Sequence, residues 1–192
     1  MSAKLDSRQI ITTSANVKRA MLDACAKDID IAANILTDTV KNGGKILWCG
    51  NGGSAADAQH MATELMGGLR DHDRPAIASI ALTNDSSFLT AWSNDTDFNT
   101  IFSRQLDALG KAGDVLVAIS TSGNSENIVQ AVIRAKAMDM AVIIFTGQSG
   151  GRLREKGDVL IRIPSDDTQR IQEGHLLAEH IMCEVVENAI LN

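Results

Sequence analysis

The sequence contains no tyrosine and few other aromatic residues, which limits the ligands it is suited to bind. Four Phe and two Trp are spread over 192 residues. Aromatic side chains are the usual stacking platforms for nucleic-acid bases. The net charge is −6 and no basic stretch occurs, so the electrostatic footprint of a nucleic-acid-binding protein is lacking too. The composition therefore argues against nucleic acid as a partner.

Cysteine pairs and long apolar runs are also absent. Cys25, Cys49 and Cys183 are odd in number and scattered, which favours neither a disulfide framework nor a cysteine zinc site. No apolar run reaches the roughly 20 residues that a membrane helix needs. The polar N-terminal residues 1–7 lack the apolar core of a secretory signal. We therefore expect a cytoplasmic protein without a membrane partner.

The sequence contains only two prolines, with no proline-rich linker and no repeat. This predicts a single domain over residues 1–192. Short runs rich in Ile and Val predict buried strands at residues 45–49, 76–82, 114–120, 141–146 and 158–163. Helical patterns lie between most of these strands, at residues 55–66, 99–109 and 126–138, and at the two ends of the chain, at residues 7–42 and 168–191. Strands that alternate with helices predict an α/β fold, a parallel sheet with helices on both faces.

The helices expected at the two ends exceed what one small sheet can cover. They either thicken the core or pack against helices of another copy of the chain. The small size of the sheet favours oligomerisation through helix packing.

Two short polar loops each follow a strand-like run and lead into a helix-like stretch. Residues 50–54 read Gly-Asn-Gly-Gly-Ser, and residues 120–125 read Ser-Thr-Ser-Gly-Asn-Ser. Backbone N–H groups at a helix start, together with nearby hydroxyls, can hold an anion. The second loop carries four hydroxyls and no Lys or Arg, which is more than helix capping needs. The pair of loops indicates a phosphosugar site.

His60 and Glu64 are four residues apart and project from one face of the helix after the first loop. A histidine and a carboxylate at this spacing can share a metal, or one of them can serve as a proton-transfer base. The same spacing also occurs in ordinary surface pairs, so the pair alone does not decide between them.

The last helix carries Gln172, His175 and His180. Residues eight apart on a helix lie about 80° apart, so Gln172 and His180 can face one site. His175 lies close to Gln172 by the same measure, and periodicity does not choose between the two histidines. The polar pair Asn94-Asp95 is expected in a loop near the second strand, where spacing alone indicates a turn.

Taken together, these motifs resemble sugar isomerase (SIS) domains and, among them, the phosphoheptose isomerases. The resemblance covers nearly the full length. It rests on Cys49-Gly50-Asn51-Gly52-Gly53-Ser54, His60-x-x-x-Glu64, Ser120-Thr121-Ser122-Gly123-Asn124-Ser125, Arg170-Ile171-Gln172-Glu173 and His180. It implies one SIS domain with a flavodoxin-like five-stranded parallel sheet, extra N- and C-terminal helices, and a homotetramer with sites between subunits.

The resemblance also implies a set of site residues. It implies Glu64 and His180 as catalytic residues and one Zn²⁺ per subunit held by His60, Glu64, Gln172 and His180. The substrate contacts that it implies are Asn51, Gly52, Gly53, Glu64, Asn94, Asp95, Ser120, Thr121, Ser122, Ser125 and Gln172.

The reaction implied by the family converts sedoheptulose 7-phosphate to D-glycero-D-manno-heptose 7-phosphate, the first step toward ADP-heptose for lipopolysaccharide core. An aldose–ketose isomerisation through an enediol needs a base and a proton donor, which Glu64 and His180 can supply. A ketol-isomerase for another phosphosugar would carry the same loops. A non-catalytic SIS-fold binding protein, the replication-initiator-associating factor of bacteria, also shares them but lacks equivalents of Glu64 and His180.

Overall fold

A five-stranded parallel sheet forms the centre of the molecule in the computed structural model, which describes residues 6–191. The strand order is β2-β1-β3-β4-β5, and every neighbouring pair is parallel. The strands are β1 (Ile46–Gly50), β2 (Ser79–Ala81), β3 (Val115–Ile119), β4 (Ala141–Thr146) and β5 (Val159–Arg162). The predicted flavodoxin-like α/β fold is confirmed. Residues 1–5, which begin the polar N-terminal segment, and residue 192 lie outside the described residues.

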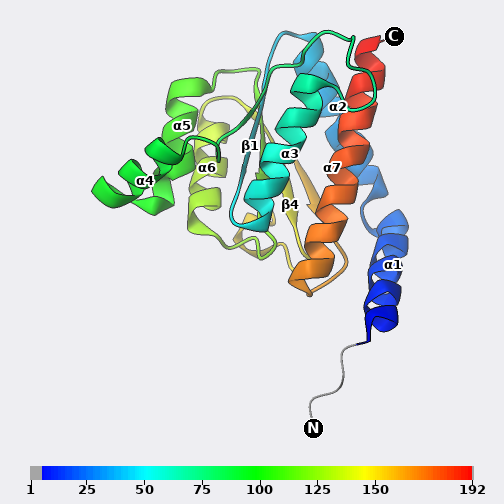
Figure 1. The fold of residues 1–192 in the computed structure, drawn as a ribbon. Helices are drawn as coiled ribbons and strands as arrows, with labels where there is room; N and C mark the ends of the chain where they lie inside the picture. The colour runs from blue at the N-terminus through cyan, green and yellow to red at the C-terminus, as the bar shows by residue number, and fades with distance from the viewer. Residues whose placement is uncertain (1–5, 192) are drawn as a thin grey trace.

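Helices cover both faces of the sheet and create two separate hydrophobic cores. One core lies under α1 (Ser7–Ala24), α2 (Ala26–Lys41), α3 (Gly53–Gly67) and α7 (Thr168–Leu191). The other lies under α5 (Ile101–Leu109) and α6 (Glu126–Ala137), with α4 (Ser86–Asp95) at its margin. Short 3-10 turns occur at η1 (Phe98–Thr100) and η2 (Gly151–Leu153). Figure 1 shows α3 and α7 side by side on one face and α4, α5 and α6 on the other.

The strand order brings the two predicted loops together. The chain passes from β1 outward to β2 and then returns to β3 on the other side of β1. The loops after β1 and β3 therefore enter helices on opposite faces, and they flank the crevice where open α/β sheets bind ligands. Asn51 of the first loop and Asn127 in the first turn of α6 are joined by two hydrogen bonds of 2.9 Å between their side-chain amides.

Three expectations for local structure are corrected. The helix predicted over residues 7–42 is divided at Cys25 into α1 and α2, and the second strand is shortened from residues 76–82 to Ser79–Ala81. Asn94 and Asp95 do not lie in a loop but in the last turn of α4. That helix forms because the Asp85 carboxylate caps it, accepting a hydrogen bond from the Phe88 N–H at 2.9 Å.

The three cysteines are free and buried, in agreement with the absence of a predicted disulfide framework. Within residues 6–191, no helix combines the length and apolar character needed to cross a bilayer.

Candidate active site

The turn between β1 and α3 depends on two glycines. Gly52 has a φ of +57°, a conformation that L side chains rarely adopt, and serves as the N-cap of α3. Gly53 packs directly against the Gln172 side chain of α7, so a Cβ at this position would overlap the Gln172 amide. Because glycine is the N-cap, α3 begins at Gly53 without a side-chain cap, and Ser54 is buried in its first turn.

Three predicted site residues converge where α3 faces α7. His60 Nε2 and Glu64 Oε1 are 2.9 Å apart, and the rings of His60 and His180 meet edge to face with centroids 4.9 Å apart. One ligand atom from each of the three residues lies within 4.8 Å of the other two. Two helices distant in sequence thus direct two imidazoles and one carboxylate at a single point.

His180 presents a free lone pair to this cluster. Its Nδ1 lies 2.8 Å from the Leu176 carbonyl oxygen, which can only accept a hydrogen bond. Nδ1 must therefore carry the proton, which leaves Nε2 unprotonated in the neutral ring. A backbone carbonyl in this position is the usual outer partner of a metal-binding histidine.

His175 is not part of the cluster, which settles the choice that periodicity left open. It is fully buried, its Nε2 donates to the Thr146 carbonyl at 3.1 Å, and its ring packs edge to face on Phe145. Burial lowers the pKa of His175 to about 4, although the hydrogen bond to Thr146 acts in the opposite direction. His175 is thus a neutral core residue.

The chemistry of the cluster fits a divalent metal. Two imidazole nitrogens and one carboxylate oxygen are the ligand types of catalytic zinc sites that keep an open position for water or substrate. The spacing of the three ligand atoms is compatible with one ion after small side-chain movements. Gln172 packs against Gly53 along the same α3–α7 contact, and its role as a fourth ligand stays a prediction.

The loop after β3 holds its hydroxyls close together. Ser120 Oγ and Ser125 Oγ are 3.3 Å apart, and Ser122 Oγ accepts a hydrogen bond from the Asn124 N–H at 3.1 Å. Ser125 is the N-cap of α6 but makes no side-chain capping hydrogen bond, so its hydroxyl is not used to terminate the helix. Thr121 and Ser122 also line a polar cavity of about 230 Å³ with residues 147–149, Ser165, Asp166 and Thr168. These features suit the predicted phosphate cradle.

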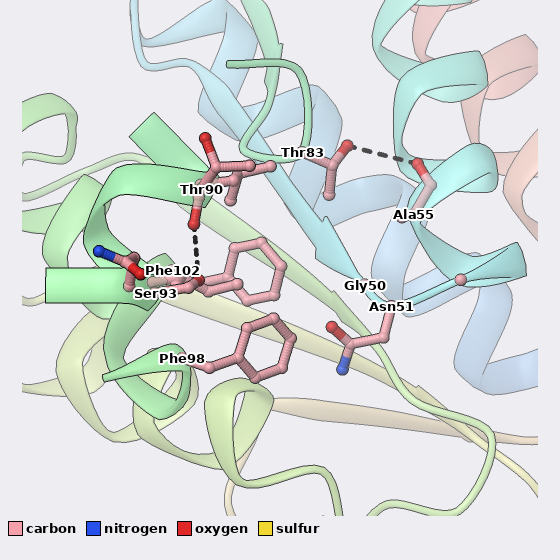
Figure 2. Close-up of a pocket in the computed structure, with 12 residues that line it drawn as sticks. Gly50, Asn51, Ala55, Thr83, Thr90, Ser93, Phe98 and Phe102 are labelled. Carbon is pink, nitrogen blue, oxygen red and sulfur yellow. Dashed lines mark hydrogen bonds between the residues drawn. The ribbon is translucent and has the colours of Figure 1, made fainter. Parts of the chain in front are cut away.

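A larger cavity of about 670 Å³ lies between the first loop and α4, and contains other predicted contact residues. Asn51, Gly52 and Asn94 line it, while Phe98 and Phe102 supply much of its apolar wall. Figure 2 shows the two phenylalanine rings on one side and the Asn51 side chain facing them. Asp95 does not line this cavity, and its carboxylate instead accepts a hydrogen bond from the Asn94 amide at 2.6 Å.

The predicted residues therefore fall into two regions on different sides of α3. Ala55 faces the cavity and Thr83, whereas His60 and Glu64 face α7. None of the cluster residues is among the described residues that line the cavity. Asn94 and Asp95 are consequently not brought to the histidine–glutamate cluster of their own chain.

Two buried carboxyl groups beside the cluster were missed by sequence reasoning. Glu179 is fully buried and Asp57 Oδ2 is buried, and neither Glu179 oxygen nor that atom has a hydrogen-bond partner among the described residues. Burial, and then the nearby Asp57, raise the pKa of Glu179 well above its usual range. Burial also raises the pKa of Asp57, against the opposing effect of His60 and His180. The three-residue spacing from Asp57 to His60 was the only available signal.

Comparison with known proteins identifies the family. The model of the SIS domain matches residues 11–147. A curated phosphoheptose isomerase from Thiobacillus denitrificans is 50% identical over 181 residues, which are 93% of this chain and 91% of the relative. The chain belongs to the SIS domain family, among the phosphoheptose isomerases. It is therefore an enzyme of the isomerase class.

Solved structures of phosphoheptose isomerases share this SIS fold. The structure from Neisseria gonorrhoeae is 44% identical in sequence with a TM-score of 0.88. The match covers 94% of this chain and 96% of the Neisseria chain. The structure from Francisella tularensis is 38% identical with a TM-score of 0.91 and the same coverage.

Proposed function

We propose that this chain is a sugar-phosphate isomerase that converts sedoheptulose 7-phosphate to D-glycero-D-manno-heptose 7-phosphate in the cytoplasm, as the first step toward ADP-heptose. The observation that carries the proposal is the convergence of His60, Glu64 and His180 on one point. A binding protein with the same loops has no need of a carboxylate and two imidazoles in contact. Relatives about 50% identical that are named phosphoheptose isomerases support the choice of a heptose substrate.

The reaction requires one proton to move between adjacent carbons. Loss of a proton from C1 of the ketose gives an enediolate with its negative charge on O2, and transfer of the O1 hydroxyl proton to O2 with delivery of a proton to C2 gives the aldose. Glu64 and His180 can accept and donate these protons, since the His180 imidazole has an unprotonated Nε2. His60, Glu64, Gln172 and His180 would hold a zinc ion, which when bound supplies Lewis-acid stabilisation of negative charge on the substrate oxygens.

We assign substrate binding to both loops. The hydroxyls of Ser120, Thr121, Ser122 and Ser125, with the α6 N-terminus, would hold the phosphate without a cation. Asn51, Gly52 and Gly53 would contact the sugar, and Asn94 and Asp95 would complete a site on a neighbouring subunit. The separation of Asn94 from the cluster of its own chain supports a site between subunits.

Assembly as a homotetramer accompanies this proposal. On α1, Ile11 is 67% exposed and Leu22 is 71% exposed, which is high for large apolar side chains. Leu177, Ile181 and Val185 follow one another at four-residue spacing on α7 and are also exposed. These two helices pack together, so their apolar residues can form one surface for other copies of the chain.

The decisive experiment is an isomerisation assay of the purified protein on sedoheptulose 7-phosphate, with and without a chelator. We expect turnover by the wild type and a loss of at least 100-fold in Glu64→Gln and His180→Gln. His72→Gln and Glu184→Gln, which change an exposed histidine and an exposed glutamate, serve as controls and should retain activity. Unchanged turnover in both site variants would refute the assigned roles. No turnover by the metal-supplied wild type would favour another phosphosugar or a binding protein.

A further inference from the structure

A buried ion pair lies at the α3–α7 contact beyond the histidine–glutamate cluster. Arg74 Nε donates to Glu187 Oε2 at 2.7 Å, and their side chains are 1% and 3% exposed. The pair joins the segment after α3 to the last turns of α7. Replacing both members of a buried ion pair by apolar residues is often neutral, because both charges lose their hydration on folding, whereas removing one member leaves an unpaired buried charge and is destabilising. The position of the Arg74–Glu187 pair between α3 and α7 therefore calls for an explanation beyond stability.

Arg74 holds the C-terminal end of α3. Its Nη2 donates to the carbonyl oxygens of Glu64 at 2.9 Å and Leu65 at 2.8 Å, and its Nη1 donates to the Pro75 carbonyl. These two carbonyls also accept the backbone N–H groups of Gly68 and Ile77, so Arg74 adds a cation at the negative end of the helix dipole. Glu64 thus connects the two sites, because its side chain lies in the histidine–glutamate cluster and its backbone carbonyl accepts a hydrogen bond from Arg74.

Glu187 holds the segment that leaves α3. Its carboxylate accepts hydrogen bonds from the N–H groups of Leu69 and Arg70 at 2.8 Å each and of Asp71 at 3.3 Å. With Arg74 it collects four donors, and these interactions lower the pKa of Glu187 to about 2 although its burial acts to raise it. The group is charged at neutral pH and cannot move without leaving these donors unpaired.

The ion pair and the cluster share one face of α7. His180 and Glu187 are seven residues apart and lie within about 20° of each other around the helix. Between them, Cys183 packs on Met61 of α3 with the two sulfurs 3.7 Å apart. A displacement at Glu187 is therefore transmitted along a packed contact to the point where His180 meets Glu64 and His60.

We propose that Arg74 and Glu187 are positioning residues that set the distance between α3 and α7 and so hold Glu64 and His60 opposite His180. This inference rests on the proposed site. It predicts that weakening the pair changes the metal-binding geometry of a chain that is still folded. Loss of a residue that hydrogen-bonds a ligating side chain typically costs 10- to 100-fold in metal affinity, and we expect an effect of the same order when the position of α3 relative to α7 changes.

The chain offers a matched control. Arg70 and Glu184 form an ion pair at 2.8 Å between the same segment and the same helix, but their side chains are 68% and 40% exposed. An exposed pair of this kind contributes little. Glu187→Gln should therefore differ from Glu184→Gln, although both remove one carboxylate from α7.

The test measures Co²⁺ binding to the purified protein by the visible absorption of the bound ion. We expect the dissociation constant to rise at least 10-fold in Glu187→Gln and in Arg74→Lys, and to stay within twofold in Glu184→Gln. The imidazole ¹H–¹⁵N signals of the metal-free protein give a second readout. Those of His60 and His180 should shift in Glu187→Gln, while that of the exposed His72 should not.

Folding is checked by circular dichroism and thermal denaturation. A folded Glu187→Gln with unchanged Co²⁺ affinity and unchanged His60 and His180 signals would overturn the proposal. If this variant fails to fold, Arg74→Lys, which keeps the charge, is judged by the same measurements. If both fail to fold, the pair determines folding only and the proposal is also overturned.

If the wild type binds no Co²⁺, the shifts of the His60 and His180 imidazole signals alone decide whether the proposal stands. Sugar turnover is not measured, so loss of the proposed isomerase activity would be a separate result.

Discussion

His175 and His180 lie five residues apart on α7, and their surroundings give the two imidazoles opposite properties. His180 is partly exposed and meets His60 and Glu64, whereas His175 is enclosed by β4 and donates to the Thr146 carbonyl. Sequence periodicity could not separate them because both lie near Gln172 on the helix. The distinction depends on which side of α7 packs on the sheet, and that is set by residues distant in the chain.

The depressed pKa of His175 predicts a loss of stability in mild acid. Its pKa is about 4 in the folded protein and about 6.5 in an unfolded chain, so the unfolded state binds the proton first as the pH falls. The free energy of unfolding should therefore decrease by about 2 kcal/mol between pH 7 and pH 5 from this residue alone. Urea denaturation at both pH values measures it. His175→Gln, which keeps a donor for Thr146, should show a correspondingly smaller decrease.

The depressed pKa of Glu187 predicts a second loss of stability, at lower pH. Its pKa of about 2 in the folded protein lies below the usual value of 4.5, so its stabilising effect is present above pH 4.5 and is lost as the pH falls toward 2. Denaturation midpoints between pH 5 and pH 3 should fall more steeply for the wild type than for Glu187→Gln. Equal slopes would show that the pKa of Glu187 is not depressed in the folded protein.

At the scale of elements, the close contact of α3 with α7 at Gly53 predicts a separation of activity from stability. Gly53→Ala introduces a Cβ that overlaps the flexible end of Gln172 rather than backbone, and alanine favours a helix over glycine. We expect the melting temperature to hold or rise while turnover falls about 10-fold, because Gln172 must move away from the site.

Gly67→Ala is the matched control for Gly53→Ala. Gly67 lies in the last turn of the same helix, and a Cβ there would meet nothing within 4 Å. This variant should keep full turnover. If Gly53→Ala is as active as Gly67→Ala, the position of Gln172 is not important for the reaction.

The three central strands were predictable because each is a short apolar run buried on both faces, such as Val115–Ile119. The spacing of His60 and Glu64 also placed them correctly on one helix face. The helix at α4 was missed because none of its residues is buried, so it lacks the apolar periodicity of a core helix. The Arg74–Glu187 pair could not be found, since its members lie 113 residues apart and form no local pattern.

At the scale of the whole molecule, the apolar residues of α1 predict how copies of the chain associate. Leu22→Glu should reduce the assembly below the proposed tetramer, because it places a charge on a helix that has only one buried residue of its own, Met21. The molar mass from light scattering after size-exclusion chromatography measures this. Ile133→Glu, at an exposed position of α6 on the opposite face of the sheet, is the control and should leave the mass unchanged.

The weak anchoring of α4 has a consequence for the time course of amide hydrogen exchange. Because α4 buries no residue, its backbone hydrogen bonds can open without the loss of a core, whereas those of β1 and β3 break only on global unfolding. Amides of residues 86–95 should exchange much faster than those of the central strands. Since Asn94 and Leu89 also line the large cavity, a ligand bound there would slow this exchange. Deuterium uptake at α4 would then report occupancy of the cavity directly, without following any chemical conversion.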